Sequence, residues 1–357
     1  MRVTLEDVCE KGASNLKQSD VVSMTGEYPI YGAAGYLGNV DFYHQEKPYV
    51  AIVKDGAGIG RTTLHPAKSS VIGTMQYLLP KDNVLPEYLY YVVRHMHLEK
   101  YFTGATIPHI YFRDYKNEKF NLDSLDKQAK IVEILGNAEL VILKRRQQLA
   151  ELDKLIKARF VEMFGDPVQN SLKWVTKSLL EMGYCKNGVN FHSGDSGIEI
   201  HCLGVGDFKD YSVVDGTDYL PTISLSEEPP EESMLQDGDI VFVRSNGNKA
   251  LVGRCLVVYP HNTPTTYSGF CIRYRLTSNE VNTSYLLRVL KADSMRKKMI
   301  GRGANIQNLN QKTLATLNIP IPPMELQEQF AEFVNQTDKS KVVVQKALSK
   351  NVQYFTI

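Results

Sequence analysis

Basic and amide side chains gather in two glycine-containing segments that have the pattern of hairpin tips. The segment 56–60 alternates glycine with other residues after the apolar stretch 48–54, and Gly253 closes a polar segment that follows the apolar stretch 239–244. Glycine lets a backbone approach another molecule closely, and Lys, Arg and Asn side chains bind phosphates and base edges. The tips therefore supply these candidate DNA-binding residues: Lys54, Arg61, Arg244, Asn246, Lys249 and Arg254.

Two further polar segments, 103–114 and 302–313, each begin around a glycine and precede an expected long helix. Their side chains are of the kind that hydrogen-bond to bases or phosphates. The residues singled out are His109, Tyr111, Arg113, Arg302, Gln307 and Asn308. A junction between domain and helix that is held by its own polar network explains each of these residues equally well.

The glycines of segment 56–60 also invite a dinucleotide or S-adenosylmethionine site. Their spacing is not GxGxxG, the residues that follow have the pattern of a strand rather than a helix, and no acid stands about twenty residues on. The chain contains no Asn-Pro-Pro-Tyr or Asp-Pro-Pro-Tyr box, no P-loop, no HExxH and no GxSxG, and its histidines lack zinc-ligand spacing. These absences count against S-adenosylmethionine enzymes and ATPases more strongly than against nucleases, whose acids are sparse.

The element that must position these segments is a long helix predicted over 124–164. Its apolar residues recur every seven positions, which is typical of a helix that winds against a partner. Gly165 and Pro167 mark its end. The predicted seam consists of Ile131, Leu135, Ala138, Ile142, Arg145, Leu149, Leu152, Ile156, Arg159 and Met163.

A second copy of this arrangement follows at an offset of 199 residues. The offset places Gly104 on Gly303 and Gln128 on Gln327, and it preserves the heptad register in a second predicted helix over 324–355. A long internal repeat takes precedence over single motifs. The chain therefore consists of two copies of a globular domain followed by a long helix. The second seam contains Phe330, Val334, Thr337, Lys341, Val344, Leu348, Asn351 and Phe355.

Further helices are expected over 88–100 and 283–299, at corresponding places in the two globular domains. Length fits two or three domains, and formal net charge is only +1 in 357 residues. Charge is segregated, however: segment 291–302 has five bases and one acid, whereas 227–239 has six acids and no base. Such segregation suits one anionic partner and one protein partner, although charge runs are also often solvated faces.

Five scattered cysteines without a CxxC pair indicate free thiols in a reducing cytosol. The sequence shows no signal core and no 18-residue apolar run. We therefore expect a soluble, cytoplasmic protein.

The two helix entries, 123–135 and 321–334, and the helix tail 152–167 resemble the specificity (S) subunit, HsdS, of type I restriction–modification systems. The resemblance covers essentially the whole chain. It implies an α+β fold in which two similar α/β target recognition domains are joined by two long antiparallel coiled-coil helices, with a pseudo-two-fold repeat. The implied divisions are a first recognition domain at 1–123, a first helix at 124–167, a second recognition domain at 168–319 and a second helix at 320–357. The second helix is shorter and more polar than the first.

The resemblance also implies a non-catalytic chain that reads a bipartite, asymmetric site in double-stranded DNA. Two modification (M) subunits and restriction (R) subunits are then the expected partners. No cofactor is expected in this chain itself, since S-adenosylmethionine, ATP and Mg would bind the partner subunits. No metal site is expected either. Two other classes stay open: a DNA-acting methyltransferase or nuclease with an unrecognised site, and a coiled-coil interaction scaffold.

Overall fold

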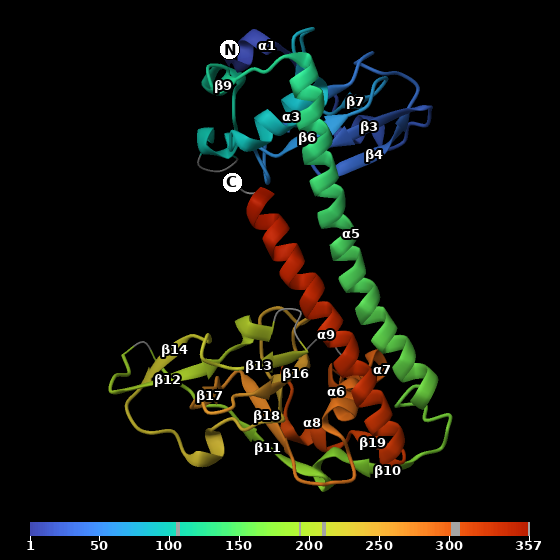
Figure 1. Cartoon of the computed structure of the whole chain (residues 1–357), viewed down its shortest axis with the longest axis vertical. Helices are drawn as coiled ribbons and strands as arrows, with labels where there is room; N and C mark the ends of the chain where they lie inside the picture. Colours follow the sequence, from blue (N-terminus) through green and yellow to red (C-terminus); the bar gives the residue numbers. More distant parts are fainter. Residues whose placement is uncertain (105–107, 193, 209–211, 301–307, 356–357) are drawn as a thin grey trace. The chain divides into compact units, whose positions relative to one another are not determined.

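The computed structural model describes residues 1–104, 108–192, 194–208, 212–300 and 308–355. The chain divides into two compact units, Met1–Leu143 and Lys144–Ile357. Both mix strands with helices, and the helix α5 (Leu125–Phe164) runs from the first unit into the second (Figure 1). Among the described residues, no helix is both long and apolar enough to cross a membrane.

The first unit contains two small sheets and a terminal strand pair. A four-stranded antiparallel sheet has the order β2 (Cys9–Ala13), β8 (Met75–Pro80), β5 (Tyr49–Val53), β6 (Thr62–His65). A three-stranded sheet has the order β4 (Gly35–Val40), β3 (Tyr28–Gly32), β7 (Ser70–Val71), with β3 and β7 parallel. The strand β1 (Arg2–Thr4) pairs with β9 (Lys119–Asn121). The helices are α1 (Leu5–Val8), α2 (Gln18–Val21), α3 (Pro86–His95), the 3-10 turn η1 (Leu98–Tyr101), α4 (Phe112–Tyr115) and the first part of α5.

The second unit repeats this plan with one more strand. Its larger sheet has the order β11 (Gly183–Asn187), β18 (Cys271–Leu276), β15 (Asp239–Val243), β16 (Cys255–Tyr259), β13 (Val213–Asp215). Its smaller sheet has the order β14 (Thr222–Leu225), β12 (Ile198–Leu203), β17 (Thr265–Tyr267), with β12 and β17 parallel. The strand β10 (Val175–Ser178) pairs with β19 (Asn318–Ile321). The helices are α6 (Thr283–Lys291), α7 (Asp293–Ile300), α8 (Gln311–Ala315), α9 (Met324–Phe355) and the 3-10 turns η2 (Leu179–Glu181), η3 (Val205–Phe208) and η4 (Glu231–Ser233).

A pair of buried glutamines shows how closely the two units correspond. Gln128, in the first turn of α5, accepts a hydrogen bond from Leu85 N at 2.8 Å and donates to the carbonyls of Asn83 and Asp123. Gln327, in the first turn of α9, makes the same three bonds with Asn282 N at 2.8 Å and the carbonyls of Glu280 and Pro322. Both glutamines are 0 % exposed. Each one ties the start of a long helix to the loop before the domain helix, and together they confirm the repeat inferred from the sequence.

The long helices follow the predicted heptads. The predicted seam positions from 131 to 163 in α5 and from 330 to 351 in α9 are buried or half-buried, whereas neighbours such as Leu155 and Val343 are exposed. Within the second unit the end of α5 and the start of α9 lie side by side (Figure 1), with Phe160 5.5 Å from Phe330 between ring centroids. Lys341, further along α9, pairs with Asp153, further back along α5, at 2.7 Å. The two helix segments therefore run antiparallel.

Corresponding buried positions of the two larger sheets use different chemistry. In the first unit Tyr49 of β5 meets Tyr77 of β8, with ring centroids 5.0 Å apart. At the matching places of the second unit stand Asp239 and Arg273, which form an ion pair at 3.7 Å with 1 % and 0 % of their side chains exposed. Asp239 also accepts two hydrogen bonds from Arg275, at 2.8 and 2.7 Å. An aromatic contact in one copy is thus replaced by a charge network in the other.

Two predicted helices end earlier than the sequence pattern indicated. The helix expected over 88–100 stops at His95, because His97 adopts a left-handed conformation with φ 52° and a 3-10 turn follows. The helix expected over 283–299 breaks at Ala292, whose backbone is extended. The break redirects the chain so that Met295 and Met299 of α7 reach the same core that α6 packs against.

Candidate nucleic-acid interface

The first predicted tip connects β5 to β6 and is held by main-chain hydrogen bonds. Val53 N donates to Arg61 O at 2.9 Å, Gly60 N donates to Val53 O at 2.9 Å, and Arg61 N donates to Gly58 O at 3.1 Å. Gly60 has φ 80°, and a Cβ on it would lie 2.5 Å from the backbone nitrogen of Glu99. Only glycine fits this position, since both the conformation and the space exclude a side chain.

The second predicted tip, between β15 and β16, has the same frame. Val243 N donates to Arg254 O at 2.9 Å, Gly253 N donates to Val243 O at 2.9 Å, and Arg254 N donates to Leu251 O at 3.0 Å. Gly253 has φ 76°. A Gly-Arg pair, Gly60-Arg61 in the first tip and Gly253-Arg254 in the second, therefore closes both tips in the same way, although the second tip is longer.

The structure brings each tip together with the junction segment that the sequence had placed separately. Ile110 N donates to Lys54 O at 3.0 Å, and the equivalent Leu309 N donates to Arg244 O at 2.8 Å. Antiparallel bridges join Asp55 to His109 in the first unit and Ser245 to Asn308 in the second. Those candidate residues of tip and junction that the structure describes thus come together at one place in each unit.

In the first unit this surface carries stacked aromatic and cationic groups. His109 Nδ1 lies 2.7 Å from Asp55 Oδ1, and the rings of His109 and Tyr111 are 6.3 Å apart at an interplanar angle of 23°. The guanidinium of Arg113 lies 4.8 Å from the centre of the Tyr111 ring. The side chains of Tyr111 and Arg113 are exposed. Such a platform offers both a positive charge and a flat face to an incoming ligand.

Two of the first tip's cations are partly engaged within the chain. Lys54 Nζ lies 3.9 Å from Asp55 Oδ2, and its side chain is 27 % exposed. Arg61 is exposed, but its Nη2 donates to the carbonyl of Ala33, in the turn between β3 and β4. Arg61 therefore links the two sheets' edges as well as presenting charge at the surface.

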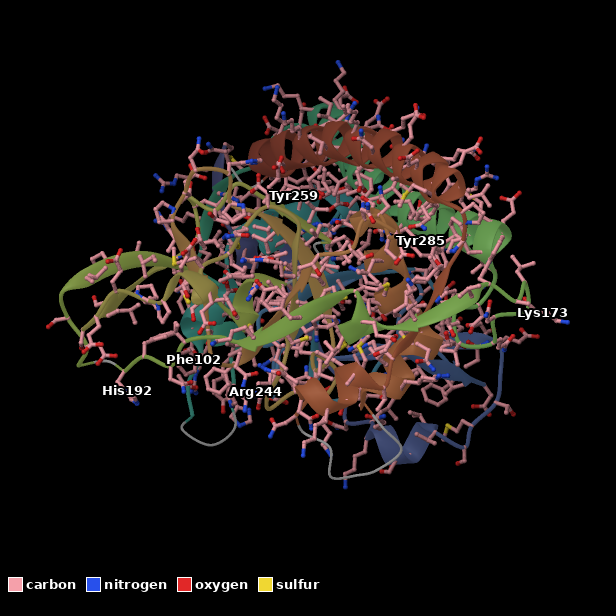
Figure 2. The ribbon with its side chains drawn as sticks, turned by 90° about the horizontal axis from the view of Figure 1, so that it is seen from below. Phe102, Lys173, His192, Arg244, Tyr259 and Tyr285 are labelled. Atoms are coloured by element: carbon pink, nitrogen blue, oxygen red, sulfur yellow. The ribbon has the colours of Figure 1, made fainter. Side chains whose placement is uncertain are left out.

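In the second unit, Arg244 is half-buried and its Nη1 donates to Gly269 O at 3.1 Å. Figure 2 shows Arg244 well apart from Tyr285, which belongs to the core beneath α9. Asn246 accepts from Asn248 N at 2.8 Å and shapes the tip, while Lys249 and Asn308 are exposed. Arg254 is half-buried. Arg302 and Gln307 lie outside the described residues, as do most of the repeated Gly-Ala motifs.

The structure removes two other chemical interpretations. The glycines of 56–60 lead into the strand β6 and not into a helix, so they lack the helix N-terminus that a dinucleotide phosphate site needs.

Burial raises the pKa of Cys9, Cys185 and Cys202 to about 12, so these thiols stay protonated and are poor nucleophiles. All five cysteines are free, as predicted. No group of three or more metal-ligating side chains occurs among the residues that the structure describes.

Sequence reasoning missed one residue beside the second tip. Phe270 is 62 % exposed in the turn before β18, and its carbonyl accepts hydrogen bonds from Arg244 N and Ser245 N. The only signal in the sequence is an aromatic residue that directly follows a Ser-Gly turn, which is too weak to single it out.

Comparison with known proteins agrees with this architecture. The family described as "Type I restriction modification DNA specificity domain" matches residues 1–154 and 210–354, so the chain belongs to that family. The specificity subunit of the type I restriction enzyme StySPI from Salmonella potsdam is 25 % identical over 252 residues, which cover 65 % of this chain and 53 % of that protein. The MjaVIII specificity subunit from Methanocaldococcus jannaschii is 23 % identical over 334 residues, 84 % of this chain and 76 % of the relative. The chain thus spans about half the length of the first relative and three quarters of the second.

Solved structures show the same fold at low identity. The S subunit of a type I restriction–modification system from M. genitalium superposes with a TM-score of 0.62 at 16 % identity, covering 99 % of this chain and 93 % of that one. A chain from a study of complex assembly in the type I R-M system gives a TM-score of 0.57 at 15 % identity and covers 100 % of this chain and 95 % of that one. The expected α+β fold, with two similar domains and two long helices, is therefore confirmed.

Proposed function

We propose that this chain is the DNA sequence-recognition subunit of a type I restriction–modification complex. Each of its two globular domains reads one part of a bipartite, asymmetric site. The observation that carries the proposal is the pair of tips held on the same main-chain frame, with Lys54 and Asp55 in one where Arg244 and Ser245 stand in the other. A common scaffold with different side chains is what two different specificities need.

The residues that we propose to contact DNA are the twelve candidates of the two tips and junctions. In the first domain these are Lys54, Arg61, His109, Tyr111 and Arg113, and in the second they are Arg244, Asn246, Lys249, Arg254, Arg302, Gln307 and Asn308. Cations would bind phosphates and guanine edges, while amides would bind adenine edges. Affinity that depends on phosphate contacts falls steeply with salt.

The proposed domain boundaries are 1–123 and 168–319 for the two readers, and 124–167 and 320–357 for the two helices. A repeat with pseudo-two-fold character allows two copies of one partner to bind a single chain. Two modification subunits are accordingly the proposed partners, with restriction subunits joining the complex and the chain itself performing no catalysis. S-adenosylmethionine, ATP and Mg would then bind those partners, and the complex would act on DNA in the cytoplasm.

The test is methylation mapping across the genome of a host that carries this chain with its neighbouring modification subunit. We expect a motif of two short blocks separated by a fixed gap, and we expect it to disappear when the chain is deleted. The matched control keeps the modification subunit and supplies a chain with Gln336→Ala, at an exposed position of α9. A continuous motif, or methylation that survives the deletion, would contradict the proposal.

A further inference from the structure

Phe270 occupies a rigid turn that holds its ring in solvent. The turn precedes β18 and is fixed by Cys271 N donating to Ser268 O at 2.8 Å and by Gly269 N donating to Val189 O at 2.6 Å. Gly269 is buried, and a Cβ on it would lie 2.1 Å from Asn190 Oδ1. The ring is nevertheless 62 % exposed. The main-chain bonds thus fix the backbone of the turn, and the Phe270 ring lies exposed on it.

The same turn is bonded to the second tip. The carbonyl of Phe270 accepts from Arg244 N at 2.8 Å and from Ser245 N at 3.2 Å. In return, Arg244 Nη1 donates to Gly269 O at 3.1 Å. The exposed aromatic ring is thus carried by a residue whose main chain is bonded to the second tip.

The fold does not require an aromatic residue here. In the first unit Lys54 N donates to Thr74 O at 3.0 Å, so Thr74 occupies the place of Phe270 in the matching frame. An exposed apolar side chain is ordinary on a protein surface and carries no meaning alone. Its position beside the candidate DNA-reading residues of the second unit, where the first unit has Thr74 in the matching place, points to a role in specificity.

We propose that Phe270 contacts the 5-methyl group of a thymine in the half-site read by the second domain. This inference rests on the proposed function. The residues bonded to this turn or bridged to the tip, Arg244, Ser245 and Asn308, have polar side chains, which suit the donors and acceptors of base edges. The thymine methyl is the apolar feature that a base pair presents in the major groove, and aromatic or aliphatic side chains recognise it by contact. Phe270 is therefore a specificity-determining residue with no counterpart in the first domain.

The experiment uses the full complex of this chain with its modification subunit. Methylation mapping first identifies the half-site whose recognition changes in the Arg254→Ala variant. Each thymine of that half-site is then replaced by deoxyuridine, which lacks only the methyl group. For the unmodified protein we expect one position at which deoxyuridine weakens binding about fourfold, as burial of one methyl group predicts. The Phe270→Ala variant should bind the thymine duplex about fourfold less tightly. Replacing the thymine at that position by deoxyuridine should not weaken its binding further. Phe270→Leu should keep part of the sensitivity.

Phe102 supplies the matched control, since it is 59 % exposed and belongs to the first unit. Phe102→Ala should leave the deoxyuridine effect at that position unchanged. The inference is overturned if the half-site contains no A·T pair, if no thymine is sensitive, or if Phe270→Ala keeps the sensitivity. It is also overturned if Phe270→Ala loses the modification subunit before DNA is added, which would make the ring a protein contact. A complex without any sequence preference would instead refute the proposed function itself.

Discussion

Replacing Gln327 by leucine should destabilise the second unit severely. The side chain is 0 % exposed, and its three partners are Asn282 N at 2.8 Å, Glu280 O at 3.1 Å and Pro322 O at 2.8 Å. Leucine fills the same volume but bonds none of them. Each buried polar group left without a partner costs about 1–3 kcal/mol. The carbonyls of Glu280 and Pro322 fall at the low end of this range, because each oxygen has a second lone pair. We expect a loss of about 3–5 kcal/mol from the free energy of unfolding, a large part of the 5–15 kcal/mol typical of a domain.

Urea denaturation measures this loss, and hydrogen exchange locates it. The amide of Asn282 should exchange much faster in Gln327→Leu than in the unmodified chain. The control is Gln336→Leu in the same helix, where the exposed side chain bonds only Glu332, and where we expect a change of at most about 0.5 kcal/mol. If the two leucine variants unfold at the same urea concentration, the buried hydrogen bonds of Gln327 contribute nothing to stability and the prediction is wrong.

Three further changes test other parts of the structure. Asp239→Asn should lower the free energy of unfolding by about 3–5 kcal/mol, because it leaves the buried Arg273 and the half-buried Arg275 without their counter-charge. Circular dichroism in urea measures this, and a change below about 1 kcal/mol would contradict it. Burial lowers the pKa of His65 to about 4, so between pH 6.5 and 4 the unfolded chain takes up a proton that the folded chain does not. Stability should therefore fall on acidification through that window, by up to about 3 kcal/mol, and His65→Phe should flatten the slope. Arg61→Ala and Arg254→Ala should each relax recognition in one half-site only, as methylation mapping would show; unchanged motifs for both would remove the tips from the interface.

The sequence was sufficient for the parts of the fold that depend on local pattern. The predicted range 324–355 is the range of α9, and the predicted start of α5 differs by one residue, because heptads, glycine and proline act over a few positions. The offset of 199 residues also aligned Gln128 with Gln327, the two residues whose buried hydrogen bonds correspond in the structure. The helix break at Ala292 could not be foreseen, since it depends on where Met295 and Met299 find their core.

The candidate DNA-binding residues were likewise predictable only where they depend on local pattern. An apolar stretch followed by a segment that ends in a Gly-Arg pair located both tips, but their contact with the junction segments is long-range: Lys54 is bonded to Ile110, and Arg244 to Leu309. Such pairings follow from the packing of whole sheets and leave no periodic trace in the sequence. Phe270 was missed for this reason, because only its carbonyl bonds to the second tip reveal where it lies.

The main-chain frame of the tips has a consequence for how such a protein changes over generations. The bonds that close segment 54–60 and the longer segment 244–253 use backbone groups, which every residue except proline supplies in full. Apart from the glycines with positive φ (Gly56, Gly58, Gly60 and Gly253), residues between Val53 and Arg61, or between Val243 and Arg254, can therefore be substituted without removing those bonds. If the tips read DNA as proposed, a lineage can sample new targets at these two places while the scaffold tolerates the mutations, and mutational robustness and diversity of recognition then arise from the same hydrogen bonds.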